Sequence, residues 1–170
     1  VSTVVSGNQN SGIALLGVPG TLTSVAVLDT VPNELGAWPG DYGHGIFAFC
    51  ETGGGCGTLE LEHCLVDSAH SAGLGAEGFS GFALASVVRA VKPRPLDARY
   101  GYGIQVAGEV VGTPTVFHVM DCQIIDADLA GILYYQASGT VSGTEVSGAD
   151  FSVVWTTPRL APVITDTNVL

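Results

Sequence analysis

The chain has 170 residues, a formal net charge of −11, and 46% hydrophobic against 12% charged residues. This length suits one domain with a sizeable core, and the apolar fraction argues against disorder. One Lys and four Arg are too few for a chain that binds the phosphates of nucleic acid or the surface of anionic lipid. No apolar stretch approaches the roughly 18 residues of a membrane span. We therefore predict a single domain over residues 1–170, with neither nucleic acid nor membrane as partner.

A Gly followed by an aliphatic residue recurs along the chain. The repeats begin at spacings of 33, 28, 30 and 28 residues: GIALLG from Gly12, GIFAFC from Gly45, GLGAEG from Gly73, GIQVAG from Gly103 and GILYYQ from Gly131. FSVVW from Phe151 is a candidate sixth start that lacks the Gly. A period in this range indicates a solenoid.

Two further short segments follow each start. The first alternates apolar and polar residues, as Leu59 and Leu61 do with Glu60 and Glu62, which is strand periodicity with one buried face. The other leads to the next Gly, and Thr3 falls in such a segment, nine residues before Gly12.

Three short strands per repeat predict an all-β fold: a single-stranded, right-handed parallel β-helix of about five to six coils. An antiparallel β-sandwich is the alternative, but it does not require the same dipeptide in every repeat. In the β-helix an aliphatic column stacks inward, and the Gly before it is expected to form a tight corner with positive φ. The column consists of Ile13, Ile46, Leu74, Ile104 and Ile132.

GIQVAG followed by TVFHVMDCQIIDADLAGI resembles the right-handed parallel β-helix superfamily typified by pectate lyases. That fold hosts lyases, hydrolases, epimerases, tailspikes and adhesins, so the resemblance implies a fold and leaves the function open. It also implies acidic metal ligands and a basic residue on one exposed sheet. Here that sheet offers Glu77, with Glu51 and Glu109 at its edge, and no Asp cluster, Arg or Lys. The lyase residues therefore do not carry over.

The four cysteines divide into two kinds. Cys64 and Cys122 occupy the same coil position two coils apart, about 10 Å, which is too far for a disulfide, so we expect two buried free thiols. Cys50 and Cys56 bracket ETGGG. The two open alternatives are a disulfide between them and two free thiols. The spacing does not suit zinc. No cofactor is expected, although Asp126 and Asp128 form a weak calcium candidate.

The first strand of each coil presents an apolar and aromatic face. Its predicted outward residues are Ala14, Leu16, Phe47, Phe49, Gly75, Glu77, Gln105, Ala107, Leu133 and Tyr135. Exposed aromatic residues in a row can contact sugar rings or a protein partner. The alternative is that a loop or a neighbouring subunit covers them.

Two insertions precede Gly45 and Gly103, over residues 32–44 and 92–102. Because they leave the same corner two coils apart, they can meet across about 10 Å. Together they bring Trp38, Asp41, Tyr42, His44, Arg94, Asp97, Arg99, Tyr100 and Tyr102. One hypothesis is a polysaccharide site, with Arg pairing to uronate carboxylates and His44 or Tyr100 as base. The other is that Arg94 and Arg99 form surface ion pairs with Asp97.

These patterns favour a non-catalytic extracellular or cell-surface module for adhesion, assembly or carbohydrate binding. A lyase or hydrolase acting on acidic polysaccharide and a structural spacer are the alternatives. No catalytic residue is assigned; the candidates are His44, Asp41, Arg99 and Tyr100. A polysaccharide is the expected partner, or another copy of the chain at the solenoid ends or the aromatic face. The candidate binding residues are Phe47, Phe49, Glu77, Gln105, Tyr135, Trp38, Tyr42 and Arg94.

Overall fold

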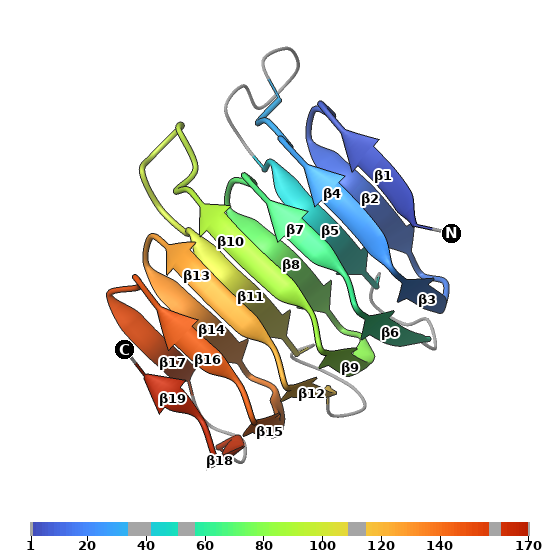
Figure 1. The fold of residues 1–170 in the computed structure, drawn as a ribbon. Coiled ribbons are helices and arrows are strands. Elements are labelled where there is room, and N and C mark those ends of the chain that lie inside the picture. The colour runs from blue at the N-terminus through green and yellow to red at the C-terminus, as the bar shows by residue number, and fades with distance from the viewer. Residues whose placement is uncertain (1, 34–41, 51–56, 109–114, 157–160, 170) are drawn as a thin grey trace.

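The computed structural model describes residues 2–33, 42–50, 57–108, 115–156 and 161–169. Within these residues every regular element is a strand, and all strand ladders are parallel. Three sheets run the length of the molecule, and the two chain ends lie at opposite ends of the stack (Figure 1). No helix in the described part is long and apolar enough to cross a membrane.

Each coil contributes one strand to each sheet. Sheet I contains β2 (Ser11–Leu16), β5 (His44–Phe49), β8 (Ala72–Glu77), β11 (Tyr102–Ala107), β14 (Ala130–Tyr135) and β17 (Phe151–Thr156). Sheet II contains β3 (Gly20–Thr23), β6 (Thr58–Glu62), β9 (Ser80–Leu84), β12 (Val116–Met120), β15 (Ser138–Ser142) and β18 (Val163–Thr165). Sheet III contains β1 (Thr3–Ser6), β4 (Val25–Leu28), β7 (Leu65–Asp67), β10 (Val87–Val91), β13 (Gln123–Ala127), β16 (Glu145–Ser147) and β19 (Asn168–Val169).

The register confirms the predicted parallel β-helix. Ile13 pairs with Ile46, Ile46 with Leu74, and the column continues through Ile104 and Ile132. β17 pairs with β14 and so forms the predicted sixth start. The all-parallel ladders rule out the antiparallel sandwich.

The aliphatic column forms the core. Ile46, Leu74, Ile104 and Ile132 are at most 2% exposed, and they pack with inward residues of sheets II and III such as Val66. The last coil is more open: Trp155 lies at the position of fully buried Tyr134 but is 48% exposed. Self-association through such an end stays a prediction.

The reason predicted for the repeated Gly was wrong. Gly12, Gly45, Gly73, Gly103 and Gly131 do not have positive φ. Instead, a Cβ at Gly45 would lie 2.6 Å from the carbonyl oxygen of Gly73 in the next coil and would also meet Val66. Close approach between coils, rather than a left-handed backbone, therefore requires Gly here.

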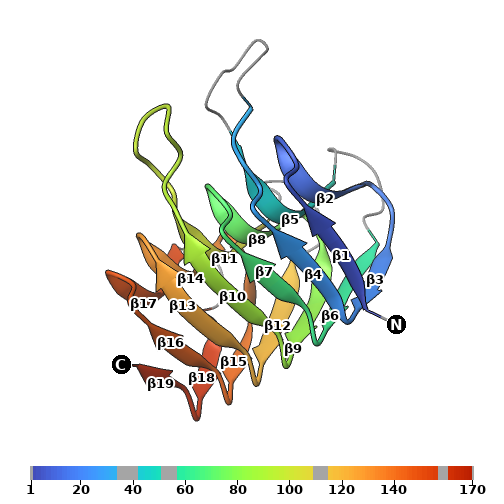
Figure 2. The same cartoon turned by 45° about the horizontal axis from the view of Figure 1, so that its top comes forward.

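Left-handed residues stack at the corners instead. The corner between sheets II and III has Ser24, His63, Ala85, Asp121 and Gly143, all with φ between 47° and 57°. The corner between sheets III and I has Asn10, Gly43, Ser71 and Gly101. Figure 2 shows the second insertion, between β10 and β11, standing out from this last corner.

Candidate functional site

An open groove of about 540 Å³ lies on the outward face of sheet I, over β2, β5, β8 and β11. With strands about 4.8 Å apart, these four strands span about 14 Å. The groove is lined by Asn10, Ser11, Ala14, Leu16, Tyr42, His44, Phe47, Phe49, Ser71, Glu77, Arg94, Tyr100 and Gln105. Residues of both insertions therefore share one cavity with the aromatic face.

The centre of the groove is aromatic. The rings of His44 and Phe47 stack at 4.5 Å with an angle of 9°, and those of Phe47 and Phe49 lie 6.1 Å apart at 12°. Phe47 lies close to Gly75 of the neighbouring strand, where an added Cβ would be 2.8 Å from Phe47 Cδ2. Because Gly75 has no side chain, the space beside the Phe47 ring stays open.

One end of the groove is polar and is formed at the corner between sheets III and I. His44 begins β5, is only 6% exposed, and lies 5.6 Å from the Tyr42 ring, centroid to centroid. Tyr42 itself is 43% exposed. An imidazole beside a phenol is a suitable pair for hydrogen bonding or proton transfer. Of the candidates from the first insertion, Tyr42 and His44 are the two that the structure describes, and they lie together at this end of the groove.

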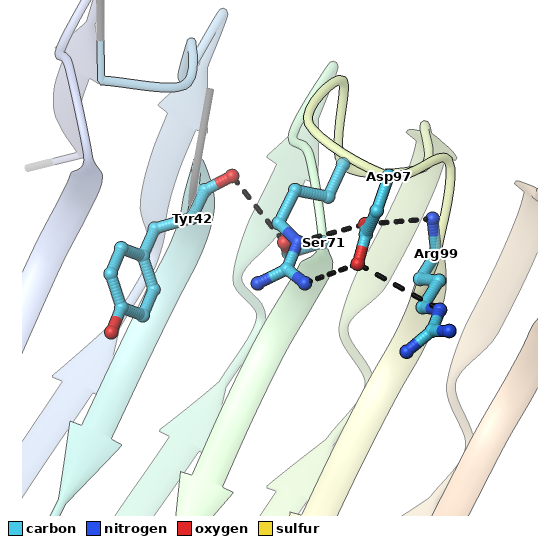
Figure 3. A network of polar contacts seen from close by, with 5 residues as sticks. Tyr42, Ser71, Asp97 and Arg99 are labelled. Atoms are coloured by element: carbon cyan, nitrogen blue, oxygen red, sulfur yellow. Dashed lines mark hydrogen bonds and ion pairs between the residues drawn. The ribbon is translucent and has the colours of Figure 1, made fainter. Parts of the chain in front are cut away.

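Buried Ser71 joins the two insertions at this corner. Its hydroxyl donates to the Tyr42 carbonyl oxygen at 3.4 Å, the contact drawn in Figure 3. Its own carbonyl oxygen accepts from the amides of Gly101 and Tyr102 at 2.8 and 2.9 Å. The polar end is therefore held by hydrogen bonds across three successive coils.

The arginines of the second insertion pair with Asp97. Arg94 donates from Nε at 3.0 Å and from Nη2 at 2.6 Å to the two carboxylate oxygens. The Arg99 amide donates to Asp97 Oδ1 at 3.1 Å, and Arg99 Nε lies 3.8 Å from Oδ2. The guanidinium of Arg94 also covers the Tyr100 ring at 4.5 Å. The expected ion pairs with Asp97 are present, and these arginine contacts lower the pKa of the Asp97 carboxyl.

Glu77, the last residue of β8, lines the groove as well. It pairs in register with Phe49 on one side and Ala107 on the other. Gln105 Nε2 donates to its carboxylate at 3.3 Å. Burial among these apolar neighbours raises the pKa of the Glu77 carboxyl.

Several predicted site residues are not part of the described groove lining. Trp38 and Asp41 fall outside the described residues, as do Glu51 and Glu109. Tyr135 points outward from β14 and is 46% exposed, but it does not line the groove. Arg99 is exposed and does not line it either. The groove residues that the sequence reading missed are Asn10, Ser11 and Ser71.

The three cysteines that the structure describes agree with the predicted division. Cys64 and Cys122 are free and buried, and burial raises the pKa of each thiol. Cys50 is disulfide-bonded. Cys56 lies outside the described residues, so its pairing with Cys50 stays a prediction. Among the described residues no three His, Cys, Asp or Glu side chains gather as a metal site, and calcium binding near Asp126 and Asp128 remains a hypothesis.

Within the described part of the lining, Glu77 is the one carboxylate and Arg94 the one cation. Glycoside hydrolysis commonly needs two carboxylates that flank the bond. The described lining thus offers groups that bind and orient a ligand, with His44, Tyr42 and Tyr100 as groups able to move a proton.

No family model, curated protein or solved structure matches this chain.

Proposed function

We propose that the protein is a non-catalytic saccharide-binding module, extracellular or at a cell surface, and that the groove on sheet I holds the saccharide. The observation that carries the proposal is the joint construction of one groove by the aromatic face and both insertions. The resemblance to pectate-lyase-like β-helices agrees with this proposal as a matter of architecture only.

The size and chemistry of the groove support a saccharide ligand. A volume of about 540 Å³ is within the range of small-molecule sites, which combine apolar walls with a few polar groups. Phe47, Phe49 and Leu16 offer apolar surface for the C–H groups of sugar rings. Asn10, Ser11 and Gln105 offer hydrogen-bonding groups for hydroxyls. An open groove across four coils also admits a chain longer than one ring.

The compartment proposed for the protein rests on its cysteine chemistry and composition. A disulfide-bonded Cys50 is typical of proteins in oxidising environments. The acidic composition with a single Lys agrees with an extracellular or surface protein, as argued from the sequence.

An enzyme is the second candidate, and one observation favours it. Tyr42 and Tyr100 both line the groove with φ of 63° and 71°. Bulky residues rarely adopt this conformation, and such backbone strain clusters at active sites. A polysaccharide lyase using His44 or a tyrosine as base would therefore have its site at the polar end of this groove.

Calorimetric titration with short oligosaccharides of neutral, acidic and amino-sugar type tests the proposal. Gly75→Leu should push the Phe47 ring into the groove and abolish binding, and Phe49→Ala should weaken it about tenfold or more through lost apolar contact. Tyr135→Ala is the matched control, since this aromatic residue lies on the same sheet outside the groove.

Binding by wild type and Tyr135→Ala but not by Gly75→Leu is the expected result. Equal loss in Tyr135→Ala and Phe49→Ala would place binding on the sheet face rather than in the groove. No affinity for any of the three sugar types would overturn the proposal. Cleavage of a bound oligosaccharide, lost on His44→Gln, would establish the enzyme instead.

A further inference from the structure

The two charged side chains of the described groove lining are not equivalent. Arg94 and Glu77 both line it, but they come from opposite sides of the site. Arg94 belongs to the insertion before β11, at the start of the sheet I strands, whereas Glu77 ends β8. If the protein already neutralises one of these two charges, the other decides which ligand charge the groove favours.

The Arg94 charge is already compensated. Its guanidinium makes two hydrogen bonds to Asp97 at 3.0 and 2.6 Å and lies over the Tyr100 ring at 4.5 Å. Its side chain is only 17% exposed. A ligand carboxylate would have to compete with a bidentate carboxylate that is already in place, and such pairs are among the stronger hydrogen-bonded contacts in proteins.

No basic side chain of the described chain compensates the Glu77 charge. The hydrogen bond to its carboxylate comes from the neutral amide of Gln105. Arg89 pairs with Asp67 in sheet III, Lys92 is exposed beyond β10, and Arg99 pairs with Asp97. Burial, without a nearby cation, accounts for the raised pKa of Glu77.

Three of the remaining segments supply no cation, since residues 34–41, 51–56 and 109–114 contain neither Lys nor Arg. The fifth basic residue of the chain is Arg159, which follows β17, and β17 is three strands away from β8 in sheet I. Glu51 and Glu109 follow β5 and β11, the two strands that flank Glu77, by two residues each. The segments that follow the two neighbours of β8 are therefore acidic in sequence.

We infer that the groove selects saccharides that carry a protonated amino group, with the Glu77 carboxylate as its counter-ion beside Phe49. This inference rests on the proposed saccharide binding and names its ligand class. An ammonium group satisfies a half-buried carboxylate by charge and by hydrogen bonds, and the low-dielectric surroundings strengthen the attraction. It replaces the uronate expectation, because the groove offers an acidic sugar a compensated arginine and an uncompensated carboxylate.

Three oligomers of equal length test this inference: glucosamine, N-acetylglucosamine and galacturonate. The first two differ mainly in whether the nitrogen is charged. We expect wild type to bind the glucosamine oligomer about tenfold or more tighter than the N-acetyl oligomer, and the galacturonate oligomer most weakly. Glu77→Gln should remove the preference for glucosamine while the affinity for the N-acetyl oligomer is retained.

Glu60→Gln provides the matched control, because it removes one formal charge from the outward face of sheet II. If Glu60→Gln lowers glucosamine affinity as much as Glu77→Gln does, the attraction is to the net charge of −11 and the inference is wrong. Equal wild-type affinities for the two glucosamine-based oligomers would also overturn it and leave saccharide binding intact. Failure of all three oligomers to bind would overturn the saccharide proposal and this inference with it.

Discussion

Tyr42 and Tyr100 occupy equivalent positions of the coil two turns apart. Each lies two residues before the first residue of a sheet I strand, β5 or β11, and each is followed by a Gly with positive φ. The local sequences are YGHGI and YGYGI. Both tyrosines hold a left-handed backbone and both line the groove. The two insertions therefore end in the same way and deliver the same side chain to one site.

Tyr100 has a left-handed backbone. We therefore predict that its Gly variant is more stable than its Ala variant, which is the reverse of the order expected in a strand. Gly adopts this conformation without the steric cost that Ala meets, so Tyr100→Gly should be more stable than Tyr100→Ala by about 1 kcal/mol. Urea unfolding measures the difference. At Tyr102, which lies within β11, Gly should instead be the less stable variant. The same order at both positions would contradict the strain at Tyr100.

Close packing between coils predicts that Gly45→Ala destabilises the protein strongly. The new Cβ would lie 2.6 Å from the Gly73 carbonyl oxygen, and backbone cannot move aside as a flexible side chain can. We expect a loss of about 3 kcal/mol in the free energy of unfolding. Gly17→Ala is the control: it has open space around the Cβ but a φ of 66°, so it should lose only about 1 kcal/mol. Equal losses in the two variants would contradict a clash between the new Cβ at position 45 and the neighbouring coil.

The raised pKa of Glu77 predicts a pH-dependent gain in stability for Glu77→Gln. Since burial raises this pKa, the folded state holds the proton more tightly than the unfolded state does. The stability of wild type therefore falls as the pH rises from the ordinary glutamate pKa through the raised one. Above that window Glu77→Gln should unfold at a higher temperature than wild type, and below it the two should converge. Thermal unfolding across pH checks this, with Glu60→Gln as control. A variant less stable than wild type at neutral pH would contradict it.

The cysteine arrangement predicts selective labelling by a thiol reagent. In the native protein Cys64 and Cys122 should react slowly, because both are buried and burial raises the pKa of both thiols. After unfolding without reductant, these two should be labelled, and Cys50 and Cys56 should not. Peptide mass mapping identifies the labelled sites. Label on Cys56 in the unfolded, unreduced protein would contradict the predicted Cys50–Cys56 disulfide.

Much of the fold could be predicted from the sequence because a β-helix repeats its packing. Each inward position, such as Ile46 and Leu74, meets its own equivalent one coil away, so the period in the sequence is also the spatial register. The role of Gly45 could not be predicted in the same way. Whether a Gly serves positive φ or close approach depends on the backbone of the neighbouring coil, which the spacing does not show.

The sequence was enough to predict most of the residues that face the groove, but not which of its charged side chains are paired within the protein. The outward positions of Phe47 and Glu77 followed from strand alternation, and the meeting of the insertions followed from their equal place in the coil. Ser71 was missed because a Ser before AGL carries no distinctive pattern, although YGHGI and YGYGI could have revealed the shared corner. The pairing of Arg94 with Asp97 depends on side-chain geometry, which decides that this arginine is compensated within the protein.

Mapping of backbone amide shifts by NMR during titration with a glucosamine oligomer tests the central claim most directly. If the groove binds the saccharide, the shifts should concentrate in β5, β8 and β11 and in the corner residues Tyr42, Ser71 and Tyr100. The outward residues of sheets II and III should remain unchanged, and Glu77→Gln should reduce the shifts around β8. Shifts centred on sheet II or sheet III, or spread evenly over the acidic surface, would contradict the claim that the groove on sheet I is the binding site.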